Sequence, residues 1–213
     1  MLQLLLVILL SYLAGSFPTA IIISRLIIKD DIRKYGSGNA GATNVFRVMG
    51  WKPGLIVITV DIAKGMLAVL VIAKLAHSVG LNEIIAQIIA GFSAIIGHIW
   101  TVFAGFRGGK GVGTAFGVFL GLTPLASLIA FTVWVLLIVL TRYVSIASLS
   151  AGFIFGLVLL MQKYYFKADV PVPLLLLGGI IVLLVFYTHR SNIKRLIKGK
   201  ETKIGEKKLI RDD

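Results

Sequence analysis

The sequence predicts an all-α, polytopic integral membrane protein, a helical bundle of about seven transmembrane helices. The chain of 213 residues is 58% hydrophobic and only 15% charged, and its mean hydropathy is +0.96. Soluble domains are less apolar and more charged than this. Apolar runs recur along the chain, and Lys and Arg gather in alternate connecting segments. We therefore expect a single membrane domain over residues 1–213, in which residues 190–213 form a basic cytoplasmic tail.

Seven apolar runs account for most of the chain. They cover residues 2–23, 53–75, 83–103, 112–121, 125–140, 144–161 and 172–187. A helix that crosses the hydrocarbon core needs roughly 20 residues. The fourth run is shorter, so it either takes length from the glycine-rich residues before it or is a re-entrant segment, which would leave six full spans.

The distribution of charge predicts the orientation. With seven spans and the N-terminus outside, the inner segments hold 18 of the 22 Lys and Arg residues and the outer segments hold three. Cytoplasmic loops are enriched in Lys and Arg, so the C-terminus and the elaborate loops should be cytoplasmic. The net charge of +13 then reflects these loops, and no nucleic-acid partner is expected. No Lys or Arg precedes the first run, which favours a retained helix over a signal peptide.

The stretch from Gly97 to Thr114 contains the strongest candidate site. Arg107 and Lys110 lie among glycines at 105, 108, 109, 111 and 113. Glycine lets the backbone come close to a ligand, and cations beside bare N–H groups at a helix start favour phosphate oxygens. A nucleotide-binding Walker A loop is excluded, because residue 104 is Ala and Gly111 follows the lysine. Glycines at every fourth position from 105 to 121 also predict close helix packing from Gly113 onward.

A second polar loop lies between the first and second runs. Its residues 36–47 read GSGNAGATNVFR. The match of residues 36–41 to the dinucleotide-binding pattern is spurious, because no strand precedes it. Ser, Asn, Thr and Arg interleaved with Gly suit a loop that positions a phosphate-bearing substrate, and the alternative is a solvated turn.

Further polar residues stand at the ends of the other runs or within them. Ser145 begins the sixth run, either as a helix cap or as a ligand contact, and His189 closes the seventh, either as an interfacial anchor or as a functional group. His98 is expected to make a structural hydrogen bond. Asp61 and Lys64 are three apart, which predicts a neutralising pair inside the bilayer more than a proton or substrate path.

Several chemistries are excluded by absent residues. The chain has no cysteine, so it has no disulfide, thioester intermediate or thiolate metal site. No His is followed four residues later by Asp, so the acid–base pair of the soluble-type glycerolipid acyltransferases is missing. No cluster of acids and histidines has metal-binding spacing, and neither metal nor cofactor is expected.

Four motifs in order resemble the bacterial acyl-phosphate:glycerol-3-phosphate acyltransferases, the PlsY family of small membrane enzymes. They are GSGNAGATNVFR at 36–47, GHIWTVFAGFRGGKGVGT at 97–114, RYVSIAS at 142–148 and HRSNIKRL at 189–196. Two departures are the pair Trp100-Thr101, where a Pro is expected, and a longer basic tail. Neither touches a residue proposed for chemistry.

The resemblance implies a multi-pass protein of the bacterial plasma (inner) membrane that acts at its cytoplasmic face. It would transfer a fatty acyl group from acyl phosphate to glycerol 3-phosphate, giving lysophosphatidate and phosphate, with membrane lipid as a partner and a monomer as the expected state. The acyl-phosphate pocket would comprise Ser37, Asn39, Thr43, Asn44, Gly108 and Gly109. Glycerol 3-phosphate or the reacting groups would be held by Arg47, Lys110, Ser145, His189 and Asn192. Gly38, Arg107 and Gly111 complete the substrate-binding set.

The mixed anhydride of an acyl phosphate needs no covalent acyl-enzyme. The proton of the attacking hydroxyl would pass to His189 or to a substrate phosphate, and the sequence leaves both open. The alternative function is a transporter of a phosphorylated small solute, since broken helices and glycines also face anions there. Such a protein should place its cations near the midplane and show an internal repeat, and this chain shows neither feature. A purely structural subunit is disfavoured by the elaborate inner loops.

Overall fold

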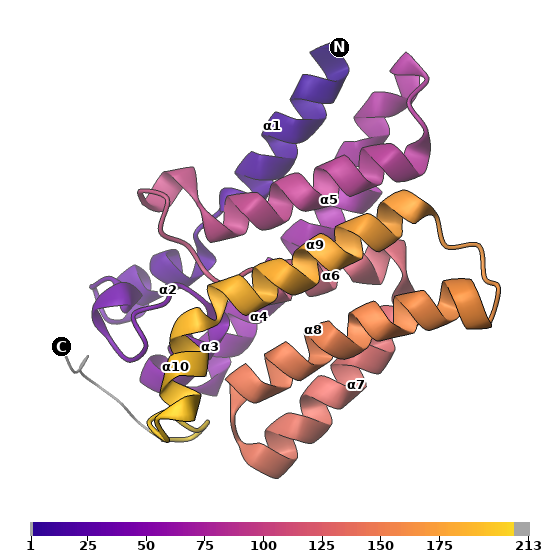
Figure 1. The fold of residues 1–213 in the computed structure, drawn as a ribbon. Helices are drawn as coiled ribbons and strands as arrows, with labels where there is room; N and C mark the ends of the chain where they lie inside the picture. The colour runs from indigo at the N-terminus through magenta and orange to yellow at the C-terminus, as the bar shows by residue number, and fades with distance from the viewer. Residues whose placement is uncertain (1, 207–213) are drawn as a thin grey trace. The chain divides into compact units, whose positions relative to one another are not determined.

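The computed structural model describes residues 2–206, and over that range the chain is helical with no β-strand (Figure 1). Its described residues form two compact units, one of residues 2–118 with 205 and 206, and one of residues 119–204. Each is described by itself. The single membrane domain stays a prediction, and residues 207–213 of the expected basic tail lie outside the described residues.

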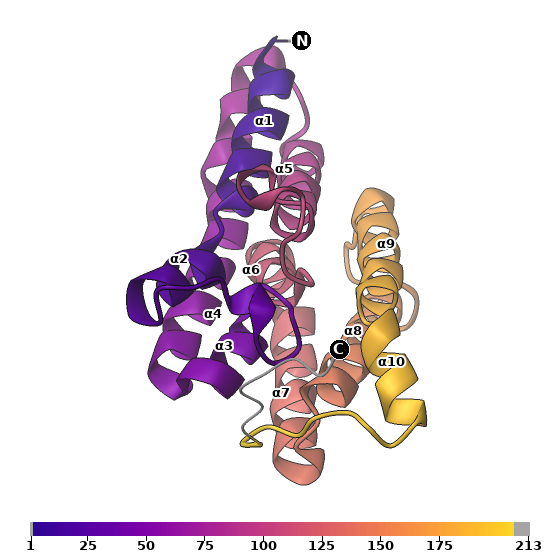
Figure 2. The same ribbon diagram turned by 90° about the vertical axis from the view of Figure 1, so that its left-hand side faces the viewer.

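The first unit contains the two glycine-rich loops. Its elements are α1 (Leu2–Ser16), α2 (Thr19–Ile27), the short 3₁₀ turn η1 (Ile32–Lys34), α3 (Ala42–Met49), α4 (Trp51–Leu70), η2 (Ile72–Val79), α5 (Glu83–Ile99), η3 (Val102–Ala104) and the start of α6 (Val112–Leu122). Figure 2 shows α1 leading into α2 through a short break. Pro18 accounts for the break, because proline has no N–H and its ring clashes with a preceding carbonyl.

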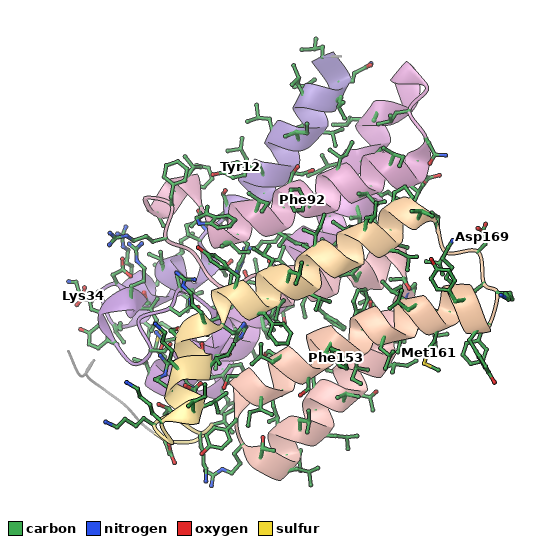
Figure 3. The ribbon with its side chains drawn as sticks, viewed as in Figure 1. Tyr12, Lys34, Phe92, Phe153, Met161 and Asp169 are labelled. Carbon is green, nitrogen blue, oxygen red and sulfur yellow. The ribbon has the colours of Figure 1, made fainter. Side chains whose placement is uncertain are left out.

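Close helix contacts in this unit depend on glycine. A Cβ added to Gly15 of α1 would lie 2.0 Å from the carbonyl oxygen of Ala94 in α5, and one on Gly117 of α6 would lie 2.0 Å from that of Ile62 in α4. Helices in lipid associate through such small residues. The predicted packing ridge after Gly113 is confirmed. Tyr12, marked in Figure 3, also donates its hydroxyl hydrogen to the carbonyl oxygen of Trp100 at 2.7 Å, which holds α1 to the end of α5.

The second unit is built from the remaining helices. They are α7 (Pro124–Thr141), α8 (Val144–Leu160) with its π-helical extension η4 (Met161–Tyr165), α9 (Val172–Thr188) and α10 (Arg190–Ile197). Figure 1 shows α7 and α8 as an antiparallel hairpin and α9 running beside α8. Phe153 of α8, marked in Figure 3, is 60% exposed, as expected of a lipid-facing side chain.

The predicted apolar spans are confirmed as helices. Among residues 2–206, five helices are long and apolar enough to cross a membrane, and α9 with α10 forms a sixth candidate that bends by 55°. The fourth predicted run forms α6, which has 11 residues and covers about 17 Å. Because α6 begins at Val112, it takes no length from the glycine-rich residues before it. The expectation that remains is a short segment. The orientation of the termini stays a prediction.

Candidate active site

The loop at 36–47 is organised around the side chain of Asn44, which is 1% exposed. Its Oδ1 accepts from the amide of Ser37 at 2.9 Å. Its Nδ2 donates to the backbone carbonyls of Ile32, Tyr35 and Asn39 at 3.0–3.2 Å. The side-chain amide of Asn44 therefore holds the loop in its conformation. The contact with acyl phosphate that the resemblance implies for Asn44 stays a prediction.

The second half of this predicted polar loop forms the first six residues of helix α3. The carbonyl of Gly41 accepts from the amides of Asn44 and Val45 and begins the helix. Thr43 lies in the first turn, and Arg47 lies in the last turn with 8% exposure. Ser37, Gly38 and Asn39 precede the helix and are partly buried. The predicted loop residues are thus presented by a turn and a short helix.

The glycine stretch packs closely against the end of α5. The amide of Gly108 donates to the carbonyl of Ile99 at 3.0 Å, and that of Gly109 donates to the carbonyl of His98 at 3.1 Å. A Cβ at Gly109 would lie 2.2 Å from Nε2 of His98, and one at Gly108 would lie 2.0 Å from the His98 carbonyl oxygen. The expectation of bare N–H groups at these two positions is wrong, because the backbone carbonyls at the end of α5 take both hydrogens.

The cations of the stretch are presented differently. Arg107 is exposed and Lys110 is partly buried. Gly111 follows with a φ of 84°, a left-handed conformation that glycine adopts without strain. Helix α6 then begins at Val112. Lys110 therefore lies next to a helix N-terminus, where partial positive charge favours anions.

A buried polar cluster lies beneath the glycine stretch. Nζ of Lys64 is 2.8 Å from Oδ1 of Asp61, and Nδ1 of His98 is 3.5 Å from the same oxygen. Lys64 also donates to the carbonyl of Phe17 at 3.2 Å, an oxygen at the break between α1 and α2 that accepts from the amide of Thr19 as well. The predicted neutralising pair is confirmed, and Lys64 adds a second hydrogen bond at the break.

A small cavity adjoins this cluster, with room for about one water molecule. Its walls include the break after α1, the buried pair of α4, and the two glycines that contact His98. Thr101 and Ser16 also line this cavity, and the hydroxyl of Thr101 donates to the carbonyl of Ser16. Thr101 is one of the two departures from the family pattern, and here its hydroxyl closes a hydrogen bond that a proline could not make.

In the second unit, the carboxylate of Glu201 collects three donors. Oε1 accepts from Oγ of Ser145 at 2.9 Å and from Nδ2 of Asn192 at 2.6 Å, and Oε2 accepts from Nε of Arg195 at 2.7 Å. Burial acts to raise the pKa of Glu201, but the hydrogen bonds from Asn192, Arg195 and Ser145 outweigh it and hold that pKa below its usual value. Glu201 is therefore ionised at neutral pH.

Of the two roles expected for Ser145, helix cap or ligand contact, the structure shows that the cap is wrong. Tyr143 is the N-cap of α8, and Ser145 makes no capping bond because its hydroxyl donates to Glu201. Glu201 is not among the predicted site residues. An acid in an otherwise basic segment, after Asn192 and Arg195 on one helix face, was the available signal.

His189 lies at the bend between α9 and α10 and is 3% exposed. Its Nδ1 is 2.8 Å from the carbonyl oxygen of Val185. A carbonyl only accepts, so Nδ1 carries the hydrogen, and the lone pair of the neutral ring is on Nε2. This is the tautomer that a general base acting through Nε2 requires.

The predicted site residues therefore fall into two groups. The first unit holds the members at 37–47 and 107–111, and the second holds Ser145, His189 and Asn192. Their convergence on one pair of substrates stays a prediction.

Comparison with known proteins identifies the family. The family model described as glycerol-3-phosphate acyltransferase matches residues 5–199. The glycerol-3-phosphate acyltransferase of Chlorobaculum parvum is 45% identical, and the alignment covers 96% of this chain and 97% of that protein. That of Chlorobaculum tepidum is 43% identical with the same coverage.

Solved structures agree with the sequence comparison. The crystal structure of PlsY (YgiH), an integral membrane glycerol 3-phosphate acyltransferase, in its glycerol 3-phosphate form matches with a TM-score of 0.83 and 37% identity over 95% of this chain and 96% of that one. Its lysophosphatidic acid form matches with a TM-score of 0.80 and 36% identity over the same shares. With the fold and nearly the whole length in common, this chain belongs to the glycerol-3-phosphate acyltransferase (PlsY) family.

Proposed function

We propose that the chain transfers a fatty acyl group from acyl phosphate to glycerol 3-phosphate, giving 1-acyl-sn-glycerol 3-phosphate and inorganic phosphate, an early committed step of phospholipid synthesis. The main support is the match to two forms of one relative, named for glycerol 3-phosphate and for lysophosphatidic acid. These molecules differ by a single acyl group, so they are the acceptor and the product of one acyl transfer.

The chemistry needs positioning more than a nucleophilic side chain. The glycerol hydroxyl oxygen attacks the carbonyl carbon, the bond from that carbon to the phosphate oxygen breaks, and phosphate leaves with the electron pair. The hydroxyl proton ends on phosphate, directly or through a base. Holding both substrates in register removes about 7–11 kcal/mol of the barrier. The proposed reaction uses no metal and no covalent acyl-enzyme.

The cations would offset the repulsion between two phosphate-bearing substrates. Arg47 and Lys110 are the proposed catalytic cations, and Arg107 is a substrate-binding one. Well-placed donors aimed at developing charge contribute on the order of 3–4 kcal/mol each. The position of Lys110 beside the start of α6 supports this assignment.

The second unit would receive the glycerol end of the acceptor. Ser145 gives its one hydroxyl hydrogen to Glu201, so toward a ligand its oxygen can only accept. An accepting oxygen suits a glycerol hydroxyl and does not suit a phosphate oxygen. Ser145 and Asn192 are accordingly proposed to orient the hydroxyls, with His189 Nε2 or a substrate phosphate as the proton acceptor.

The decisive experiment uses the purified protein with acyl phosphate and glycerol 3-phosphate. Release of phosphate and formation of lysophosphatidate are measured together, with acyl-CoA as a parallel donor and a chelator in one arm. We expect turnover with acyl phosphate alone as donor, unaffected by the chelator. Transfer from acyl-CoA but not from acyl phosphate would refute the proposed donor.

Replacing the histidine distinguishes the two proton acceptors. If His189 is the base, His189→Ala lowers kcat steeply while KM for glycerol 3-phosphate hardly moves, and the loss depends on pH. A loss confined to KM would assign the proton to a substrate phosphate instead. The matched control is Arg190→Ala, because Arg190 is the adjacent exposed residue at the same bend.

The acyl chain is proposed to lie between helices, with its phosphate end at the cytoplasmic face of the bacterial inner membrane. Soluble donors of increasing chain length test this. KM for the donor should fall with each added CH₂, because burying that group contributes about 0.8 kcal/mol at most to the free energy of binding. A KM that is independent of chain length would contradict it.

A further inference from the structure

We propose that Arg33 is a positioning residue. It holds the backbone turn at residues 104–107 and so fixes the direction of the candidate phosphate-binding cations that follow the turn. This role rests on the proposed function of Arg107 and Lys110. Arg33 lies in the connection between α2 and α3, outside the four motifs that resemble the family, and the proposed chemistry does not use it.

The guanidinium of Arg33 joins two segments that are far apart in sequence. Nη1 donates to the carbonyl of Ala104 at 2.8 Å and to that of Arg107 at 3.2 Å. The two accepting residues are 71 and 74 positions from the arginine. One side chain therefore binds both ends of the turn that precedes the glycine pair.

The other edge of the guanidinium is fixed by Asp31. Nε lies 3.0 and 3.1 Å from the two carboxylate oxygens, and Nη2 lies 2.7 Å from Oδ2. Oδ1 also accepts from the backbone amide of Arg33 at 2.9 Å and caps the turn η1. A planar fork held by a carboxylate on one side can point its remaining hydrogens in only one direction.

The turn that Arg33 holds has an unusual backbone. Gly105 has a φ of 63°, and Phe106, which has a side chain, has a φ of 58°. Residues with a Cβ avoid this left-handed region. The Phe106 side chain is 59% exposed, so its burial does not compensate. Hydrogen bonds stabilise the turn instead. Arg33 donates to two of its carbonyls, and the Phe106 amide donates to the Thr101 carbonyl at 2.8 Å.

The consequence for the site follows from chain connectivity. Arg107 is the last residue of the turn, the glycine pair follows it directly, and Lys110 comes next. Release of the Ala104 and Arg107 carbonyls would let the turn relax toward ordinary φ values. The two cations would then lose their fixed direction, and the binding of phosphate-bearing substrates would weaken before the chemical step is affected.

Asp31 and Arg33 together form a clamp on this turn, and both stay charged across the physiological pH range. Hydrogen bonds from Arg33 lower the pKa of Asp31, and the same contact raises that of Arg33. The other charged group that acts on this pair is Arg25, which favours the ionised form of Asp31. No loss of the clamp by titration is expected near neutral pH.

The test measures acyl transfer and local backbone order in full-length protein. Arg33→Ala should raise KM for glycerol 3-phosphate or acyl phosphate by about tenfold, with kcat changed much less. Arg33→Lys should recover only part, because an ammonium cannot reproduce the fork. Millimolar methylguanidinium should restore KM in Arg33→Ala. The matched control is Arg25→Ala, which removes an exposed cation from the last turn of α2, just before this connection, and should leave both constants unchanged.

A second measurement does not depend on activity. The chain has no cysteine, so a nitroxide on Phe106→Cys reports the turn alone. Its spectrum should become more mobile with Arg33→Ala and return with methylguanidinium. Unchanged KM values together with an unchanged spectrum would overturn the proposal, as would a general loss of stability with the spectrum unaltered. If neither the parent chain nor Arg25→Ala transfers acyl groups, the proposed function fails, and the nitroxide still tests the clamp.

Discussion

Glu201 shows how one ionised side chain can set the direction of several hydrogen-bond donors. Because its pKa is lowered by its three donors, its stabilising contribution is present above the pKa of about 4.3 of an unfolded glutamate. That contribution is lost as pH falls through the lower folded value. At neutral pH the Glu201 carboxylate is ionised and accepts all three hydrogen bonds.

Glu201→Gln should therefore destabilise the folded protein at pH 7 by about 1–3 kcal/mol, since charge-assisted hydrogen bonds to a buried acceptor are replaced by weaker ones. Thermal unfolding in detergent measures this, and the difference from the parent chain should shrink below pH 4. The exposed Glu206 supplies the control Glu206→Gln. A stability difference that is independent of pH would argue against an ionised Glu201.

Lys64 is the second residue whose loss should be costly. Lys64→Met leaves the buried carboxylate of Asp61 without its lysine and removes one of the two donors to the Phe17 carbonyl. Breaking a buried pair costs about 3–5 kcal/mol. Thermal unfolding of Lys64→Met should show that loss, and the double variant with Asp61→Asn should recover part of it. Equal stability of the single and double variants would contradict the pairing.

At the scale of elements, glycine determines how closely helices approach. Gly117→Ala places a methyl 2.0 Å from the carbonyl oxygen of Ile62, which is backbone and cannot rotate away. α6 must then shift from α4, at a cost of about 1–3 kcal/mol or more.

The matched control is Gly179→Ala in α9, where an added Cβ meets nothing within 4 Å. It should be neutral or raise stability by up to about 1 kcal/mol, because alanine is the better helix former. Melting temperatures of the two variants test the contrast. Similar melting temperatures would contradict a close contact between α4 and α6 at Gly117.

The elements were predictable to different degrees. Composition and spacing located the apolar spans, because burial in lipid imposes length and hydropathy directly. Helix α3 escaped notice because its eight residues are rich in polar and β-branched types, and a short helix depends on tertiary packing. The break before Thr19 was missed inside a continuous apolar run, although Pro18 marked it.

Side-chain partners were less predictable than elements. Asp61 and Lys64 could be paired because three positions along a helix share a face. The contact between Ser145 and Glu201 joins residues 56 positions apart, and no local pattern specifies it. The glycine pair was identified, but its amides proved to bind the end of α5 instead of pointing outward. Only the packing of the loop on that helix end decides this.

For the whole molecule, the sidedness of the loops is the property on which the proposed site depends. The chain has no cysteine, so single cysteines can be mapped with an impermeant maleimide. Lys34→Cys, at the exposed position marked in Figure 3, should react from the cytoplasmic side, and Lys167→Cys from the opposite side.

Arg47 and Lys110 belong on the side of Lys34 in this map. Cysteines at 47 and 110 that react from opposite faces would remove the basis for a shared phosphate site. Reaction of all three from one face, opposite to 167, is the result that the charge distribution predicts.

The brevity of α6 has a consequence for its own ends. A helix of about 17 Å covers little more than half of a hydrocarbon core of about 30 Å. Every residue of α6 is at least partly buried, so protein and not lipid meets most of its surface. A helix that stops part-way through the membrane inside protein must satisfy its terminal carbonyls there, because neither headgroups nor bulk water reach them.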